Sequence, residues 1–354
     1  MPGVGDRANG WWRHDRGMQR TVGIGIRGVP LFTRADLLAR DVTPTELSRA
    51  AAGGVFLRLQ AGVYVERAAY LALRPVEQHR LAVRAAMEQT RGGSAVVSHL
   101  SASVLHDLPQ YRFRDRSVDV TVAADVGATS RRGLRRHLDA IDTGDLTTVA
   151  GIACTTLDRT VFDVMRTMPL EVAVTCADAA LRREAVVGRR FDPHAQEDWR
   201  ERMRERAARK AGARGIRRAR WVIEFADGRA ELPGESVSRV QLFRLGFVEF
   251  DLQVAVPGPR GADYFVDIAL PEARTFWEFD GEVKYRDPSL RGDRSIEQVL
   301  LDEKKREDWI RGRTQWRVCR GGFSDIATPE VLAARLEAFG VAPMRGGPVA
   351  PPPR

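Results

Sequence analysis

Two strand-like segments near the C-terminus, residues 264–270 and 274–281, combine an alternating apolar pattern with acidic side chains. The first reads YFVDIAL and carries Asp267, and the second reads RTFWEFDG and carries Glu278 and Asp280. Residues two apart on a strand point to the same face, so Glu278 and Asp280 place two negative charges side by side. Like charges at that spacing repel unless a cation or bound protons hold them together. This pattern therefore constrains the segment to a sheet that carries a polar site.

The elements around these strands predict a mixed sheet flanked by helices over residues 230–342. The expected elements are, in chain order, a helix opened by Glu235 and ended by Gly246, strands over 248–256, 264–270 and 274–279, a helix over 296–311, a strand over 315–320 and a helix over 329–340. Strict alternation places Tyr264, Val266, Ile268 and Leu270 on one face of their strand and Phe265, Asp267 and Ala269 on the other. In the next strand it places Phe276, Glu278 and Asp280 opposite Trp277 and Phe279.

The acidic residues of this block have the chemistry of a divalent-cation site. Mg²⁺ takes oxygen ligands and keeps several waters, so the carboxylates of Asp267, Glu278 and Asp280, with a phosphate oxygen, suffice to hold it. Such an ion, or Mn²⁺ in its place, activates a water and stabilises charge that develops on a phosphate. Glu235 is then a further ligand or a base that positions the water, and Lys284 orients the water or neutralises the phosphate.

This order of residues resembles the PD-(D/E)xK nuclease superfamily, which has a restriction-endonuclease-like α/β/α fold, over about residues 233–327. Within that superfamily it is similar to the branch near the very-short-patch repair endonucleases. The resemblance implies hydrolysis of DNA phosphodiester bonds with Mg²⁺. It implies Glu235 as the helix Glu and Asp267 as the first strand acid, with Glu278 and Asp280 as the acids of an E-x-D-G motif.

The chain departs from the superfamily pattern at the lysine that follows the second acid. That position holds Asp280, so Lys284, or Lys304 or Lys305 on the following helix, has to substitute. Glu303 and Arg306 lie on that same helix and can face the site, and Lys304 and Arg306 are also expected to contact DNA. A structural adaptor whose basic segment binds RNA ranks last, because the sequence has no aromatic-rich RNA-binding signature. Two functions stay open. One is a metal-dependent endonuclease, and the other is a non-enzymatic protein in which an inactive nuclease fold serves for contacts.

Residues 29–67 follow the order of a winged helix-turn-helix. Thr33 caps a short helix over 34–40, and the run Thr43-Pro44-Thr45-Glu46 forms a capping box with proline at the first helical position. That second helix ends at the Gly-Gly pair 53–54, and two short strands over 55–65 turn at Ala-Gly.

In such a module the second helix enters the major groove of DNA. Thr45, Ser48 and Arg49 are then expected to face the groove, and Arg58 on the wing is expected to lie near a phosphate. The alternative is that this helix-hairpin unit serves as a protein–protein adaptor.

Residues 68–190 read as a mixed α/β middle domain with a strand over 118–124. His99 and His106 have no partner at a catalytic spacing, which favours packed or capping histidines. The 29–67 segment, the SHLSA motif and GIACTTLDRTVFD together resemble the AbiEi-like antitoxins of type IV toxin–antitoxin systems over about residues 29–185. The resemblance implies a transcriptional regulator that binds operator DNA and has a cognate toxin as partner.

The charge of the chain favours a polyanion such as DNA as partner. The net charge is +9 and the isoelectric point is about 10. Residues 191–229 read as a basic linker or helix, and residues 201–220 within them hold nine Arg or Lys against two Glu. We expect this segment to contact phosphate. The sequence therefore predicts an α+β multidomain chain of a winged helix, a middle domain, a basic segment and a nuclease-like domain.

The remaining features concern location and the chain ends. No apolar run approaches the roughly 20 residues of a membrane span, and the N-terminus lacks a secretion signal, so we expect a cytoplasmic protein. Cys154, Cys176 and Cys319 form no CxxC pair, which argues against a disulfide framework or a zinc site. Residues 1–28 and 343–354 are expected to be a disordered leader and tail. The sequence indicates no oligomeric state.

Overall fold

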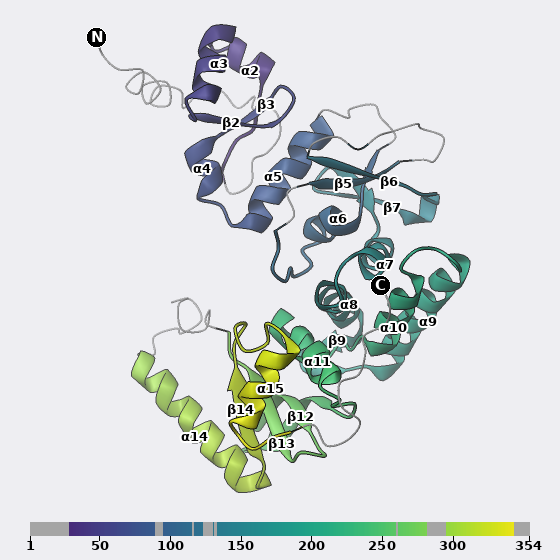
Figure 1. The fold of residues 1–354 in the computed structure, drawn as a ribbon, viewed down its shortest axis with the longest axis vertical. Coiled ribbons are helices and arrows are strands. Elements are labelled where there is room, and N and C mark those ends of the chain that lie inside the picture. Colours follow the sequence, from purple (N-terminus) through teal and green to yellow (C-terminus); the bar gives the residue numbers. More distant parts are fainter. Residues whose placement is uncertain are drawn as a thin grey trace. The chain divides into compact units, whose positions relative to one another are not determined.

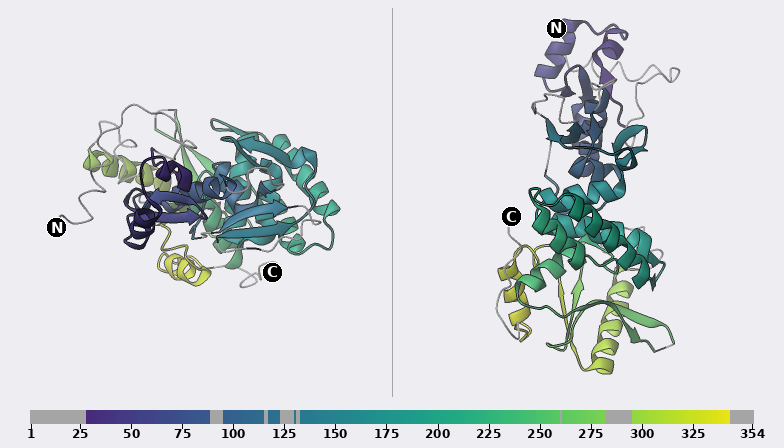
Figure 2. Two further views of the ribbon diagram at one scale, coloured as in Figure 1. Left: turned by 90° about the horizontal axis from the view of Figure 1, so that it is seen from above. Right: turned by 90° about the vertical axis from the view of Figure 1, so that its right-hand side faces the viewer.

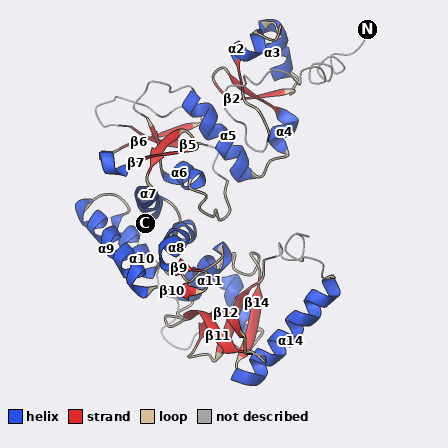
Figure 3. Cartoon of the chain, turned by 180° about the vertical axis from the view of Figure 1, so that it is seen from behind, coloured by secondary structure: helices blue, strands red, loops and turns tan. Residues whose placement is uncertain are grey.

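The computed structural model describes residues 28–88, 95–114, 117–122, 130, 133–259, 261–281 and 295–342, and these form a mixed α+β structure with several sheets (Figures 1 and 3). The chain divides into two compact units. The first holds the described residues up to Leu105 with Phe113–Cys154, and the second holds His106–Arg112 with the described residues from Thr155 onwards. Among these residues, none of the helices has the length and apolar content that crossing a bilayer requires. Apart from Gly28, the expected leader and tail lie outside the described residues.

The first unit begins with a small three-stranded antiparallel sheet that carries two short helices. Its elements are β1 (Phe32–Thr33), α2 (Arg34–Leu38), α3 (Pro44–Ala52), β2 (Phe56–Gln60) and β3 (Val63–Glu66), in strand order β1-β3-β2. Both predicted helix caps are confirmed. The Thr33 hydroxyl accepts the Asp36 N–H at 3.1 Å, and the Thr43 hydroxyl accepts the Glu46 N–H at 3.3 Å. These bonds satisfy N–H groups that no helical carbonyl reaches, so each helix starts at its cap.

A mixed five-stranded sheet forms the rest of the first unit. The elements are α4 (Arg67–Leu71), α5 (Pro75–Glu88), β4 (Val96–Val97), α6 (His99–Leu105), β5 (Val118–Val122), β6 (Leu134–Leu138), the 3-10 turn η1 (Thr143–Asp145), β7 (Leu146–Val149) and β8 (Ile152–Thr155), in strand order β6-β5-β4-β8-β7. Val83 of α5, Ala102 of α6 and Val118 of β5 meet in its buried core. His99 is buried and stacks on His137 with ring centroids 3.6 Å apart, as expected for a packed histidine.

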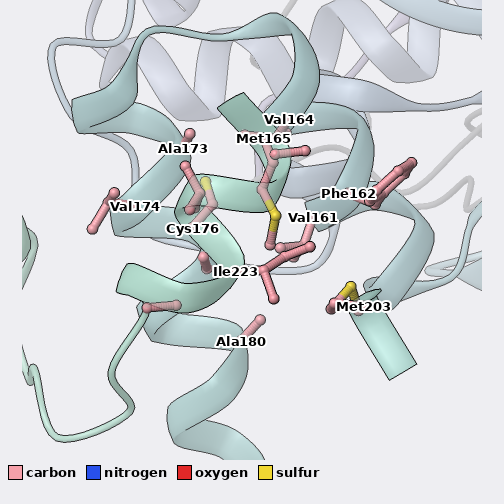
Figure 4. Packing of buried hydrophobic residues seen from close by; sticks show 14 of the residues in the cluster. Val161, Phe162, Val164, Met165, Ala173, Val174, Cys176, Ala180, Met203 and Ile223 are labelled. Carbon is pink, nitrogen blue, oxygen red and sulfur yellow. The ribbon is translucent and has the colours of Figure 1, made fainter. Parts of the chain in front are cut away.

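The second unit contains a helical half with its own core. Its elements are α7 (Leu157–Thr167), α8 (Leu170–Ala185), the hairpin of β9 (Val186–Val187) and β10 (Arg190–Phe191), α9 (Pro193–Arg209) and α10 (Ile216–Phe225). Figure 4 shows this core, in which Phe162 and Met165 of α7 lie near Cys176 of α8, Met203 of α9 and Ile223 of α10. The basic stretch predicted as a linker or a helix is therefore helical, and it supplies part of a buried core.

Several charges of the basic stretch are paired within the chain. Arg202 lies 2.6 Å from a carboxylate oxygen of Glu184. Arg204 bridges Glu197 at 2.5 Å and Glu224 at 2.7 Å. These ion pairs occupy guanidinium groups that the sequence assigns to phosphate, so the stretch is less available to a polyanion than its composition indicates.

The second unit continues with a four-stranded sheet between two helical layers. Its elements are α11 (Pro233–Arg244), β11 (Asp251–Pro257), β12 (Asp263–Leu270), β13 (Thr275–Phe279), α14 (Ile296–Thr314), β14 (Arg317–Gly321) and α15 (Pro329–Glu337), in strand order β11-β12-β13-β14. Only the pair of β13 and β14 is parallel. The helices α11 and α15 cover one face of the sheet and α14 covers the other (Figure 2). Val237 of α11 and Leu332 of α15 pack with Trp277, and Ile310 of α14 packs with Phe276. The predicted division of Phe276 and Trp277 between opposite faces is confirmed.

The strict alternation expected for residues 264–270 is wrong at one point. Leu252 and Ile268 pack with α11 and α15, whereas Val256 and Val266 pack on the α14 side. The change of face coincides with Gln253 of β11, whose φ of +50° lies in the left-handed region. A non-glycine residue in that region turns the strand. Between Gln253 and the turn that joins β11 to β12, the side chains that face each core are therefore those that strict alternation places on the other face.

A buried ion pair joins the helical half to the sheet. Asp178 of α8 lies 2.7 Å from Nη1 of Arg239 on α11. The same carboxylate accepts the Ser236 hydroxyl at 2.7 Å and the Asp227 N–H at 2.9 Å. Because a buried charge needs such partners, this pair holds α8 and α11 together. The predicted domain boundaries at 190/191 and 229/230 lie within the second unit.

Candidate functional site

The sheet of the second unit carries a pocket of about 270 Å³ at the C-terminal end of β13. Its lining includes the predicted acids Asp267, Glu278 and Asp280, together with Gln253, Arg306 and Arg320. Glu235 of α11 does not line the pocket but contacts Gln253, whose amide donates to its carboxylate at 3.2 Å. Four of the five predicted catalytic residues thus lie at or beside one pocket. The fifth, Lys284, lies outside the described residues.

Asp267 lies where the ladder between β12 and β13 ends. The two strands pair as far as Ile268 opposite Trp277. Beyond this pair, Oδ2 of Asp267 accepts the Phe279 N–H at 2.8 Å. The side chain of β12 therefore satisfies a backbone donor of β13, and it holds the carboxylate at the edge of the pocket.

Glu235, at the third position of α11, is a buried carboxyl group. It is 1% exposed, and it accepts the N–H groups of Glu231 at 2.9 Å and Leu232 at 3.1 Å. Burial, and next the charge of Asp267, raise the pKa of Glu235 to about 8. Two neighbouring carboxyl groups in a dry site resist ionising together, so this environment favours the protonated form of Glu235.

Two arginines, rather than a metal cation, balance the negative charge of Glu278. Its Oε1 lies 2.7 Å from Nη2 of Arg306 on α14, and its Oε2 lies 2.9 Å from Nε of Arg320 on β14. Glu303 pairs with the same two guanidinium groups at 3.0 Å and 2.6 Å. Opposite charges alternate around these four groups, and a third carboxylate, that of Glu307, lies 3.3 Å from Nη2 of Arg320.

The described residues do not fit the magnesium site that the sequence predicts. Both oxygens of Glu278 face guanidinium groups, and one oxygen of Asp267 accepts a backbone N–H. Asp280 lines the pocket, but nowhere in the described part of the chain do three His, Cys, Asp or Glu side chains gather as a metal site. Mg²⁺ requires oxygen ligands in near-octahedral geometry, and the carboxylate of Glu278 is held by two guanidinium groups instead.

Arg320 is the main site residue that sequence reasoning missed. It belongs to the segment predicted as a strand over 315–320, and the parallel register of β13 and β14 places it directly beside Glu278. Phe276 and Val318 pack in the same core, and the residues two positions further on, Glu278 and Arg320, share that face. Alternation within each strand was thus visible in the sequence, but the pairing of the two strands was not.

The residues predicted to contact DNA lie on both units. Thr45, Ser48 and Arg49 of α3 are exposed, as are Arg58 of β2 and Lys304 of α14. Arg306 differs from them, because ion pairs with Glu278 and Glu303 and a bond to the Phe265 carbonyl occupy its guanidinium group. We therefore assign Arg306 to the charge network of the pocket.

Comparison with known proteins gives relatives of unassigned activity. No family model matches the chain. It is 27% identical over 239 residues to two proteins of Mycobacterium tuberculosis, "Uncharacterized protein MT2308" of strain CDC 1551 / Oshkosh and "Uncharacterized protein Rv2248" of strain ATCC 25618 / H37Rv, and the match covers 68% of this chain and 79% of each relative. The crystal structure of the RV2827C protein from the same species is similar with a TM-score of 0.35 and 13% identity, over 60% of this chain and 74% of that one.

Proposed function

We propose that this protein is a DNA-binding regulator whose C-terminal domain has a nuclease-like fold in a non-catalytic form. The observation that carries the second half of this proposal is the pairing of Glu278 with Arg306 and Arg320. Glu278 is only 7% exposed, so a metal ion would have to displace two guanidinium groups from a desolvated carboxylate. Separating a buried pair leaves uncompensated charges, which opposes such an exchange.

The arrangement of α3 supports binding in the major groove. Leu47 of α3 is buried, while Thr45, Ser48 and Arg49 are exposed. At spacings of three and four residues these exposed side chains share one face of the helix. Within the described residues Arg49 forms no ion pair, so its guanidinium group is available for a bidentate contact with a base or a phosphate.

The order of elements supports a winged helix for the first segment and a restriction-endonuclease-like fold for the last. In the first segment α2 and α3 precede the β2–β3 hairpin. In the last, a four-stranded sheet lies between α11 and α15 on one side and α14 on the other. On this basis we propose an AbiEi-like regulator that binds an operator in the cytoplasm, with a cognate toxin as its protein partner.

DNA binding is tested with the full chain and duplex fragments of the DNA upstream of its own gene, using fluorescence anisotropy. Replacing Arg49 by Gln is expected to weaken binding to the preferred fragment by about 1–3 kcal/mol. The matched control is Arg67→Gln, which removes another exposed arginine, from α4, and it is expected to bind like the wild type. A wild-type chain that retards none of the fragments, or an Arg49 variant that binds with unchanged affinity, contradicts the proposed role of α3.

A metal-dependent endonuclease is the second candidate function, and one observation favours it. Asp267 and the buried Glu235 bring two carboxyl groups together, and a cation relieves such repulsion as well as a proton does. Calorimetric titration of Mg²⁺ and Mn²⁺ into the full chain, beside a plasmid-nicking assay, separates the two functions. We expect neither binding nor nicking. Binding and nicking that both disappear in Asp267→Asn would replace the regulator by the nuclease.

A further inference from the structure

A second pocket of the C-terminal domain is lined by positive charge without any carboxylate. It has a volume of about 570 Å³, which is within the usual range of small-molecule sites. Three arginines line it, namely Arg274 between β12 and β13, Arg311 near the end of α14, and Arg317 at the start of β14. They occupy the end of the sheet opposite to Glu278, because Arg317 opens the strand on which Arg320 lies.

The three arginines differ in what already neutralises them. Arg311 lies 2.7 Å from a carboxylate oxygen of Glu307. Arg274 and Arg317 form no ion pair within the described residues, and their side chains are exposed. The backbone holds these two together, since the Arg317 N–H donates to the Arg274 carbonyl at 3.1 Å. The pocket therefore carries uncompensated positive charge at two adjacent positions.

Backbone strain is concentrated at the same pocket. Arg274 has a φ of +44° and Gln315, which also lines the pocket, has a φ of +57°. Side chains other than glycine rarely adopt this region, and such strain persists where surrounding structure or function requires it. A glycine or asparagine at position 274 would turn the chain with less strain, but it would remove one of the two uncompensated guanidinium groups.

Two aromatic rings complete the lining. Trp316 is half-buried and stacks on Phe276 with ring centroids 4.8 Å apart. Phe339 is 36% exposed, and the guanidinium group of Arg335 lies 5.0 Å from its ring centroid. Each ring is thus held in place by a neighbour of the same domain. Fixed aromatic rings beside arginines can hold a planar base and a phosphate at the same time.

We propose that this pocket binds a nucleoside phosphate, supplied either by a free nucleotide or by a single nucleic-acid strand. Arg274 and Arg317 bind the phosphate through charge-assisted hydrogen bonds, since the guanidinium fork matches phosphate oxygens. Trp316 and Phe339 contact the base. This inference goes beyond the regulator proposed above, because it concerns the second unit and does not involve α3.

The test uses the full chain with two probes, AMP and a fluorescein-labelled single-stranded dT octamer. Calorimetry follows AMP, and anisotropy follows the octamer at low and moderate salt. The variant Arg274→Gln/Arg317→Gln is expected to lose about 10- to 100-fold in affinity for whichever probe the wild type binds. The matched control is Arg313→Gln, which removes an exposed arginine from the same end of α14 but outside the pocket lining, and its affinity is expected to equal that of the wild type.

The outcomes decide both the site and its ligand. Loss of affinity for both probes assigns the site to nucleotides in general, and loss for the octamer alone assigns it to a strand. Unchanged affinity of the double variant, or a wild type that binds neither probe, overturns the proposal. The single variant Arg317→Gln, with its urea midpoint measured alongside, shows that any loss arises in a folded chain. An Arg49→Gln chain keeps its affinity in these assays, so failure of duplex recognition by α3 is distinguishable from failure of this site.

Discussion

Replacing Glu235 by Gln is expected to remove a pH dependence from the folding stability of the chain. Burial and the charge of Asp267 raise the pKa of Glu235 from 4.5 to about 8, so the folded chain binds more protons than the unfolded chain between these values. The stabilisation from this proton is fully present below the unfolded pKa and is lost as the pH rises through the folded pKa. Between about pH 5.5 and pH 8.5 the linkage relation gives a loss of about 3 kcal/mol.

The assay is urea unfolding of the full chain at these two pH values, with the free energy of unfolding extrapolated to water. The wild type is expected to lose about 3 kcal/mol more than Glu235→Gln between the two conditions, because the amide stays neutral throughout. Glu249→Gln, at an exposed position of the same domain, serves as control and keeps the wild-type difference. If Glu235→Gln loses as much stability as the wild type over this interval, Glu235 does not hold a proton in the folded chain.

Two further predictions concern the second unit. Gly215→Ala is expected to destabilise the chain by roughly 2 kcal/mol or more beyond Gly188→Ala, measured by urea unfolding. Both glycines have positive φ, but a Cβ at Gly215 would lie 2.0 Å from the Arg166 carbonyl oxygen, whereas a Cβ at Gly188 would meet nothing within 4 Å. Equal destabilisation by the two substitutions would refute this steric argument. Asp178→Asn is expected to cost about 3 kcal/mol, because it removes the carboxylate that pairs with the buried Arg239. A change below about 1 kcal/mol in the same assay would contradict this role.

Much of the fold was predictable because its signals are local. The caps at Thr33 and Thr43 act within three residues, and both helices begin where these caps predict. The alternating segments of the C-terminal domain likewise form the strands expected of them. Within the two segments for which faces were predicted, alternation fails beside Gln253, a left-handed residue that no sequence pattern indicates.

The candidate site was predictable as a collection of acids but not as a balance of charges. The sequence brings Asp267, Glu278 and Asp280 to neighbouring strands, and the structure places all three at one pocket. The sequence placed Arg306 on a helix that can face the site and also assigned it to DNA, but it left Arg320 unnoticed. In the structure both pair with Glu278, so one of the three expected metal ligands belongs to an ion-pair network.

The sequence by itself determined where helices start and which residues form strands, since capping and alternation depend on neighbours along the chain. Only the tertiary structure decided which charges meet. Arg320 reaches Glu278 because β14 pairs in parallel with β13, and Arg306 reaches it because α14 packs across the same face. Electrostatic energy depends on distance in space and on desolvation, and neither quantity is set until distant segments have packed together.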